Sequence, residues 1–524
     1  MTVLVARNDT PGLDTAVSWI DRAHGATAKH RFQADDHVLC AWMSCSGTGP
    51  SIAQSDDDVV FAVGTVVYRG AVGDAACVNL MRDLREGRID SRLMTGNFVA
   101  ACSVGGRTWM LADPVGLYPL YRNSDHTIWT TMFMSVAASV GRSEINAQAL
   151  YEYVFQGTTY GTDTPVRSVR RVEPDTLYDL TGGNAEKWST FAGIGDDEPL
   201  GADPSERVLG LIESAFEPLV AHFGSNIDTA LSGGYDSRLI LAALRHLGIT
   251  PALHVYGRSN DPDVAVAKAI AEGESLALEH VDKSSLAGDM TPDVVQRNCE
   301  VFDGFAPEGI FDKGVDLSTR LDRAKGHRLA LNGGGGEIFR NFFYLPDRPM
   351  PISSLLSSFY SRFDRTTCTG VFDKDAYLKR LGAKIVEQVG AVPERMSRTQ
   401  VELAFPLVRN RFWVARNAAI NARIGHSCLP FLTPELIRAA ARIPMRLKHD
   451  GDLQARVIAA LDGRLAEYPS SYGFPFDRPP PSLHRIRSFL NRHRPIALRR
   501  HMYGIKTRIG VKAPSSDLRA SSSA

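Results

Sequence analysis

The sequence has no long apolar segment and no excess of charge of either sign. No run approaches the ~20 apolar residues of a membrane-spanning helix, and the N-terminal apolar run is too short for a signal peptide. Lysine plus arginine and aspartate plus glutamate both number 59 in 524 residues, so the formal net charge is zero. A neutral chain has no global field that draws it to nucleic acid or to a membrane. We therefore expect a cytoplasmic protein with no membrane partner, and nucleic acid is a disfavoured partner.

Cysteine is scarce and irregularly spaced. Seven cysteines are scattered through the chain, and no CxxC pair occurs. This pattern indicates neither a disulfide framework nor a zinc ribbon. The GxxxxGK[ST] motif of P-loop proteins is absent as well. Any nucleotide site must therefore be built in another way.

One such site is predicted at residues 231–237, Leu-Ser-Gly-Gly-Tyr-Asp-Ser, which we call the first turn. The apolar run 227–231 predicts a buried strand, and the amphipathic run 238–247 predicts a helix. A turn between strand and helix presents backbone N–H groups and a helix N-terminus to an anion. Asp236 would repel a bare phosphate, so we expect a divalent cation beside it. The first turn is therefore predicted to bind magnesium pyrophosphate.

The remainder of the chain divides into a β-rich part and an alternating part. Residues 1 to about 190 read as mostly β, with strand-like runs at 59–63, 97–102 and 127–131. A stretch rich in Gly, Asp and Pro, residues 193–204, predicts a linker.

After the linker, strands and helices alternate. Residues 252–256, 280–282 and 328–331 predict strands, and Asp261-Pro262 predicts the start of a helix. This order predicts a doubly wound parallel sheet with its ligand at the carboxyl ends of the strands. Residues from about 400 to 470 predict helices.

The first turn resembles the SGGxDS signature of the PP-loop ATP pyrophosphatases, which cleave ATP between the α and β phosphates. Three further segments resemble asparagine synthetase. Residues 111–121 resemble the D-x-x-G-x-x-P-L-Y turn of its N-terminal glutaminase-type domain. Residues 256–282 resemble the strand and helix that cover the adenine end of ATP, and residues 423–432 resemble its R-x-x-H-S…P-F-L-D helix start. Order and spacing match from about residue 60 to 476.

The resemblance implies an α/β plus α+β fold. An N-terminal Ntn-type glutaminase-like β-sandwich domain, residues 1–192, would precede a doubly wound, parallel-sheet PP-loop synthetase domain, residues 205–480. A basic C-terminal tail, residues 481–524, would follow.

ATP and Mg²⁺ are the cofactors that the resemblance implies. Asp236 and Glu337 are the predicted metal ligands, and both are predicted to be catalytic together with Arg456 and Lys448. The nucleotide is expected on Leu231, Ser232, Gly233, Gly234, Asp236, Ser237, Tyr256, Gly257, Gly333 and Gly334.

The sequence departs from the family at its N-terminus. Glutamine-dependent members have a cysteine nucleophile directly after the initiator Met, and here Thr2 follows it. A free N-terminal threonine can act as a nucleophile, but we favour the loss of glutamine hydrolysis. The arrangement resembles β-lactam synthetase and carbapenam synthetase, which keep the fold, lack the cysteine and form an amide within one substrate.

Two further departures affect the synthetase site. The family's G-x-G-A-D-E-L-F reads NGGGGEIF here, with Gly336 at the aspartate position; we call residues 332–337 the second turn. Glu337 either serves the metal or is only a carboxylate favoured at a helix N-terminus. In the family's R-x-K-x-G-F, Ser471 stands at the lysine position and cannot supply its charge. Arg456 and Lys448 are the candidates to replace that lysine.

These features predict an asparagine-synthetase-like, ATP-dependent, AMP-forming carbon–nitrogen ligase. It would adenylate a substrate carboxylate, which an amine or ammonia then attacks. Its partners would be small-molecule carboxylates and amines, and a homodimer stays open. Three alternatives also stay open: asparagine synthase that hydrolyses glutamine, a nucleotide-modifying PP-loop enzyme that acts on RNA through the basic tail, and a catalytically inactive ATP-binding partner protein.

Overall fold

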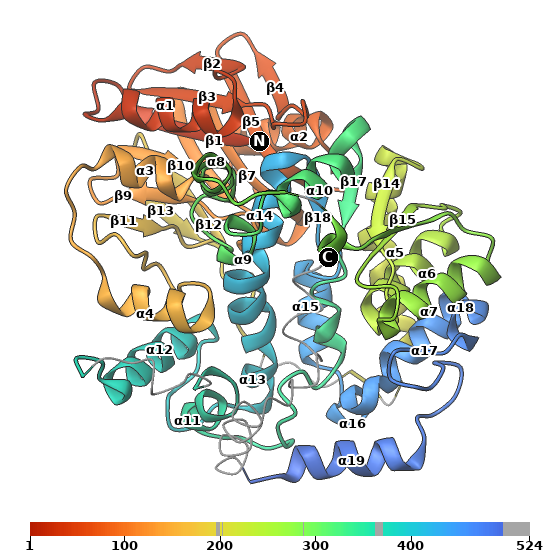
Figure 1. The fold of residues 1–524 in the computed structure, drawn as a ribbon. Coiled ribbons are helices and arrows are strands. Elements are labelled where there is room, and N and C mark those ends of the chain that lie inside the picture. Colours follow the sequence, from red (N-terminus) through yellow and green to blue (C-terminus); the bar gives the residue numbers. More distant parts are fainter. Residues whose placement is uncertain (195–199, 202, 287, 362–369, 496–524) are drawn as a thin grey trace.

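The computed structural model describes residues 1–194, 200–201, 203–286, 288–361 and 370–495. Its N-terminal part contains two antiparallel sheets (Figure 1). The six-stranded sheet, in the order β11-β9-β10-β1-β3-β2, consists of β1 (Thr2–Arg7), β2 (His30–Gln33), β3 (His37–Trp42), β9 (Tyr121–Asn123), β10 (Ile128–Thr130) and β11 (Val169–Arg171). The seven-stranded sheet has the order β13-β12-β8-β7-β5-β4, with β6 paired to β5. It consists of β4 (Ser51–Ser55), β5 (Asp58–Tyr68), β6 (Ala71–Val72), β7 (Met94–Val104), β8 (Arg107–Ala112), β12 (Thr176–Asp179) and β13 (Asn184–Lys187).

The two sheets form a sandwich because their strands carry apolar residues on both faces. Val3 and Leu39 of the first sheet share a core with Phe61 and Val99 of the second. On the outer faces, α1 (Leu13–His24) and α3 (Phe133–Ser139) cover the first sheet, and α2 (Asp74–Arg85) covers the second. Successive side chains point to opposite faces of a strand, so both faces of each sheet are buried. The predicted β-sandwich and its strands in β5, β7 and β10 are confirmed.

The second part of the chain is built on a five-stranded parallel sheet, as predicted. Its strand order is β16-β15-β14-β17-β18, and every pairing is parallel. The strands are β14 (Ile227–Ala230), β15 (Ala252–Tyr256), β16 (Leu278–Val281), β17 (Leu329–Leu331) and β18 (His426–Cys428). The order 3-2-1-4-5 reverses at β14, so the turns after β14 and β17 meet at a topological switch point, where open α/β sheets bind their ligands.

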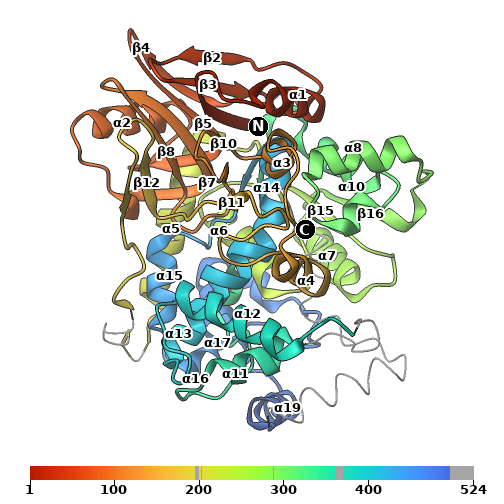
Figure 2. The same ribbon diagram turned by 90° about the vertical axis from the view of Figure 1, so that its left-hand side faces the viewer.

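Helices cover both faces of the parallel sheet. α6 (Tyr235–His246) and α7 (Pro262–Gly273) pack against β14, β15 and β16, whereas α10 (Val315–Ala324) packs against β17 and α14 (Ala415–Ile424) against β18 (Figures 1 and 2). Pro262 stands at the first position of α7, where a missing N–H costs nothing, and Asp261 is the N-cap residue, as predicted.

The remaining helices lie around this unit and below it in Figure 1. They are α4 (Ala147–Gln156), α5 (Ser205–Phe223), α8 (Pro292–Phe302), α9 (Pro307–Ile310), α11 (Ile352–Leu355), α12 (Lys374–Gln388), α13 (Arg398–Ala404), α15 (Pro434–Ala441), α16 (Met445–Lys448), α17 (Asp452–Leu461), α18 (Gly463–Glu467) and α19 (Ser482–His493). A π-helical segment, Phe405–Val414, joins α13 to α14. The helical character predicted for residues 400–470 is confirmed except at β18, residues 426–428, which add an edge strand to the parallel sheet. This strand has only three residues, too few to show a strand pattern in the sequence.

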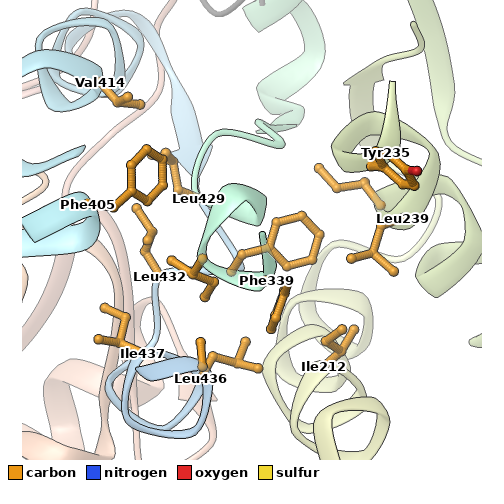
Figure 3. Packing of buried hydrophobic residues seen from close by; sticks show 14 of the residues in the cluster. Ile212, Tyr235, Leu239, Phe339, Phe405, Val414, Leu429, Leu432, Leu436 and Ile437 are labelled. Atoms are coloured by element: carbon orange, nitrogen blue, oxygen red, sulfur yellow. The ribbon is translucent and has the colours of Figure 1, made fainter. Parts of the chain in front are cut away.

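Buried apolar side chains hold the second turn in place. Phe339, just after the second turn, has Leu239 of α6 and Ile212 of α5 on one side (Figure 3). Leu432 and Leu436 pack on the opposite side (Figure 3). The second turn is therefore attached to the same core as the helix that follows the first turn.

Some predictions lie partly outside the described residues. This applies to residues 195–199 and 202 of the linker and to residues 496–524 of the basic tail. The predicted domain limits stay predictions. In the described part of the tail, α19 contacts the fold through Arg492, whose Nη1 lies 3.3 Å from Asp450 Oδ1. None of the helices that the structure describes has both the length and the apolar character needed to cross a membrane.

Candidate functional site

The first turn is held by its own hydroxyl groups and by one carboxylate from α7. The N–H of Ser232 donates to Ser237 Oγ at 3.0 Å, and the two hydroxyl oxygens lie 2.9 Å apart. The N–H of Gly234 donates to Ser232 Oγ at 3.3 Å. The N–H of Gly233 donates to Asp263 Oδ1 at 3.0 Å. The turn therefore has its shape without a ligand. The Asp263 carboxylate accepts the hydrogen bond from the Gly233 N–H that a bound anion would otherwise accept.

The helix that follows the first turn starts without a side-chain cap. α6 begins at Tyr235 with Gly234 as its N-cap residue. An uncapped first turn leaves the positive end of the helix dipole available to an anion. The Tyr235 ring is buried against Phe476, with ring centroids 4.0 Å apart, and its hydroxyl donates to the carbonyl of Asp450 at 3.1 Å.

The second turn lies directly on the first. A Cβ on Gly333 would lie 3.1 Å from the carbonyl carbon of Asp236, and a Cβ on Gly336 would lie 2.9 Å from its Cγ and collide with its Oδ1. Gly335 has a φ of +106°, and a Cβ there would lie 2.6 Å from Leu432 Cγ. Glycine is required at positions 333 and 336 because Asp236 lies close to the backbone there, and at position 335 because the backbone is left-handed and Leu432 lies close.

Two carboxylates meet where the two turns touch. Asp236 Oδ2 accepts a hydrogen bond from Arg340 Nη2 at 2.6 Å, and Asp236 Oδ1 accepts one from Gln454 Nε2 at 2.7 Å. Glu337 Oε1 lies 4.0 Å from Arg340 Nη2. Burial, followed by the charge of Asp236, raises the pKa of Glu337 to about 7. One guanidinium therefore partly neutralises two adjacent acids.

The segment of residues 465–471 packs against α6 and the first turn. Arg238 is fully buried, and its guanidinium donates to the carbonyls of Leu465, Tyr468 and Pro469. The N–H of Ser471 donates to the carbonyl of Gly233 at 3.0 Å. Ser471 therefore does lie beside the first turn, where its side chain brings no charge.

The structure does not bring Arg456 or Lys448 to the carboxylate pair. Arg456 is half-exposed and bonds to Asp452 at 2.8 Å, with Asp203 3.6 Å away. Lys448 is buried, with its Nζ 2.5 Å from Glu402 Oε2, and burial lowers the pKa of Lys448. In the described part of the chain, neither cation has a recorded contact with Asp236 or Glu337. Both are instead committed to carboxylates elsewhere.

The other predicted nucleotide residues occupy the same edge of the sheet. Leu231 is buried and its N–H donates to the carbonyl of His254 at 2.8 Å. Gly334 donates its N–H to Asn332 Oδ1 at 2.7 Å. Gly257 has a φ of +142° directly after β15. No hydrogen bond joins Tyr256 to the first turn in the described fold. Lys283 Nζ lies over its ring, 4.3 Å from the centroid.

Tyr256 and Asn332 line a cavity on one face of the parallel sheet. It extends from the carboxyl ends of β14, β15 and β17 to α10 and α14. Asp228 faces it from the middle of β14, only 1% exposed, with His254 Nδ1 2.9 Å from its Oδ1. Asp316 and the cations Lys283, Arg320 and Arg323 also line it.

Three residues of this site were not predicted from the sequence: Arg340, Gln454 and Asp263. Arg340 could have been found from the sequence, because it lies three residues after Glu337 and side chains at that spacing can lie on the same face. Gln454 and Asp263 reach the first turn from α17 and α7, and no local pattern marks them. Asp236 itself is less free than expected, since its side chain is 21% exposed and bonded twice.

Thr2 lies far from this site, within the β-sandwich. Its hydroxyl is fully buried and lies 2.7 Å from His24 Nε2. Burial lowers the pKa of His24 well below its ordinary value. Thr2 thus has a base within reach but no exposure to solvent.

No family model and no curated protein matches the chain. Among solved structures, the chain is similar to one described as the structure of the allosteric regulatory enzyme of purine biosynthesis. The identity is 10% and the TM-score 0.21, over 53% of this chain and 64% of that one, less than two thirds of its length. A similarity at this level assigns no activity to the chain.

Proposed function

We propose that this protein is an ATP-dependent, AMP-forming ligase that adenylates a carboxylate and transfers the acyl group to an amine or ammonia. The observation that carries the proposal is the meeting of two glycine-rich turns on Asp236. They follow neighbouring strands, β14 and β17, at the switch point of a parallel sheet. Beside them stand an uncapped helix N-terminus and a second carboxylate, Glu337.

The donor set suits magnesium that is shared with a nucleotide. Within the described residues no group of three or more His, Cys, Asp or Glu side chains could hold a metal alone. Mg²⁺ in nucleotide sites is typically bound by one or two carboxylates plus phosphate oxygens and water. Asp236 and Glu337 would hold it, and it would neutralise charge on the leaving pyrophosphate. The first turn and the start of α6 would bind the phosphates.

Arg340 would supply the positive charge that Ser471 lacks. It is bonded to Asp236 without nucleotide, and a metal on Asp236 would release its guanidinium toward the phosphates. There it would stabilise charge that develops when the substrate carboxylate oxygen attacks the α phosphorus and the bond to pyrophosphate breaks. The amine would then attack the acyl carbon, and AMP would leave. Lys448 and Arg456 have no part in this proposal.

The cavity beside Asn332 is our proposed site for the acyl substrate. It opens at the carboxyl ends of the same strands that carry the two turns. Its three cations, Lys283, Arg320 and Arg323, are all in salt bridges: the first two with Asp316 and the third with Glu279. A polar substrate fits such a lining of paired charges.

The cysteines disfavour the alternative of a nucleotide-modifying enzyme that acts on RNA, in the form that transfers sulfur through a reactive thiol. Burial raises the pKa of Cys428 to about 12 and also raises that of Cys299. A thiol that stays protonated is a poor nucleophile. Cys368 lies outside the described residues.

ATP–pyrophosphate exchange with a panel of mono- and dicarboxylic acids tests the proposal. We expect magnesium-dependent exchange with at least one acid, and its loss in Asp236→Asn, which keeps the shape of the side chain. The matched control is Asp452→Ala, which removes a carboxylate bonded to Arg456 and should exchange at the wild-type rate. Exchange by Asp236→Asn at the wild-type rate, or no ATP binding by the wild type, would refute the proposal.

A further inference from the structure

A second cavity lies between the β-sandwich and α14, away from the two turns. Arg171 of β11 lines it from the sandwich, and Arg416 and Arg423 line it from α14. Three hydroxyl-bearing residues complete its polar lining: Tyr121, Thr158 and Thr159. All three arginines are at least nine-tenths buried, with exposed fractions of 7%, 7% and 3%.

Among the described residues, no carboxylate lies within salt-bridge distance of Arg171, and Glu173 and Asp113 act on its charge only from farther away. In the described structure its Nη2 donates to the carbonyls of Gly116 and Arg411, both at 2.9 Å, and its guanidinium lies 4.8 Å from the centroid of the Phe412 ring. Carbonyl oxygens satisfy its N–H groups without neutralising it. A buried, uncompensated charge is costly, and proteins normally pair it.

The other two arginines each have one carboxylate partner. Arg423 Nη2 lies 3.0 Å from Asp303 Oδ2, a fully buried carboxylate. Arg416 Nη2 lies 2.9 Å from Glu308 Oε1, but the Glu308 side chain is 46% exposed and screened by solvent. Among the described residues, the buried Nε of Arg423 has no hydrogen-bond partner. Three guanidinium groups thus face the cavity. Among the described residues, the fully buried carboxylates that act on them are Asp303 and Asp113, and the oxygens of Asp113 accept backbone N–H groups of residues 116–118 rather than a guanidinium.

The size of the cavity limits what could balance this charge. The volume open to the centre of a water molecule is about 20 Å³. About 10–15 Å³ is enough for one water. A nucleotide or an amino acid does not fit, whereas a single small ion does.

We propose that this cavity binds one small monovalent anion of the halide class, which links Arg171 of the sandwich to Arg416 and Arg423 of α14. The anion would stabilise the contact between the two parts of the chain. The π-helical segment that precedes α14 carries Val414, whose Cγ1 would lie 3.1 Å from a Cβ on Gly334. The anion would thus also hold in place the π-helical segment against which the second turn packs. This inference does not depend on the proposed enzymatic activity.

Thermal unfolding of the full chain in chloride tests the site. We compare sodium chloride with sodium gluconate at equal ionic strength, because gluconate is too large for the cavity. The melting temperature should rise saturably by a few degrees in chloride but not in gluconate, as for any ligand that binds only the folded state. Arg171→Gln should abolish the difference. The neighbouring Arg170→Gln, whose arginine pairs with Asp163 at the surface, should retain it.

A wild-type measurement covers the case in which Arg171→Gln does not fold. Crystals grown in bromide should show an anomalous peak between Arg171 and Arg423, and Thr159→Val should weaken bromide binding. An ordered water in that place, without anomalous signal, would overturn the proposal. So would equal stabilisation by chloride and gluconate, since that outcome reflects ionic strength alone.

Discussion

Gly336→Ala is the substitution that most sharply tests how the two turns fit together. The new methyl group would collide with Asp236 Oδ1 and lie 2.9 Å from its Cγ. The backbone of Gly336 is outside the left-handed region, so alanine brings no strain of its own. The Asp236 side chain must therefore rotate away and release Arg340 and Gln454.

The cost to folding should be small and the cost to chemistry large. Hydrogen bonds to charged groups contribute about 1.5–3 kcal/mol when buried, and about a fifth of the Asp236 and Arg340 side chains is exposed. We expect the free energy of unfolding to fall by about 1–2 kcal/mol, after discounting for solvent screening. A displaced metal ligand forfeits several kcal/mol of transition-state stabilisation. AMP formation should therefore fall by about 100-fold or more, at about 1.4 kcal/mol for each tenfold change.

The assay pairs urea unfolding with AMP release, and Gly210→Ala serves as the control. Gly210 lies within α5, where an added Cβ meets no atom within 4 Å. Alanine there should stabilise the helix by about 0.5–1 kcal/mol and leave AMP formation unchanged. If Gly336→Ala forms AMP at the wild-type rate, the described approach of the second turn to Asp236 is wrong.

Three further predictions concern other parts of the fold. The protein should release no glutamate from glutamine, because the Thr2 hydroxyl is fully buried. Steady glutamate release that disappears in Thr2→Ala would contradict this and show a working glutaminase. The pKa of Glu337 is raised from 4.5 to about 7, so between these pH values the folded protein binds one proton more than the unfolded chain. The stability of the metal-free protein should therefore fall as pH rises from 4.5 through 7, and Glu337→Gln should flatten that slope in thermal melts. Arg238→Met leaves three carbonyls without their donor and should lower the free energy of unfolding by about 2–4 kcal/mol in urea titration; a loss below 0.5 kcal/mol would contradict this assignment.

The sequence predicted the architecture well because its signals are local. Apolar runs bounded by glycine and proline marked β14, β15 and β17, and Asp261-Pro262 marked the start of α7. The β-rich character of the N-terminal part followed from apolar runs such as β5, whose residues are all buried, and the sandwich was implied by the family resemblance. Each of these patterns depends on neighbours in the chain, which a single sequence contains.

The site was predicted only in part because its remaining contacts come from distant segments. Asp236 and Glu337 were recognised by their motifs, and their proximity follows from the order of β14 and β17. Gln454 is 218 residues from Asp236, and nothing near it in the sequence indicates the contact. Lys448 and Arg456 were chosen as nearby cations, but salt bridges to Glu402 and Asp452 engage them instead.

The fate of carboxylate oxygen tests the central claim most directly. An acid that supports ATP–pyrophosphate exchange would be labelled with ¹⁸O in its carboxylate and incubated with ATP, Mg²⁺ and an amine. Adenylation predicts that one ¹⁸O atom appears in AMP, detected by ³¹P NMR or mass spectrometry, and that Asp236→Asn yields no labelled AMP. Label in inorganic phosphate, with ADP as the second product, would mean an acyl phosphate and would contradict the account.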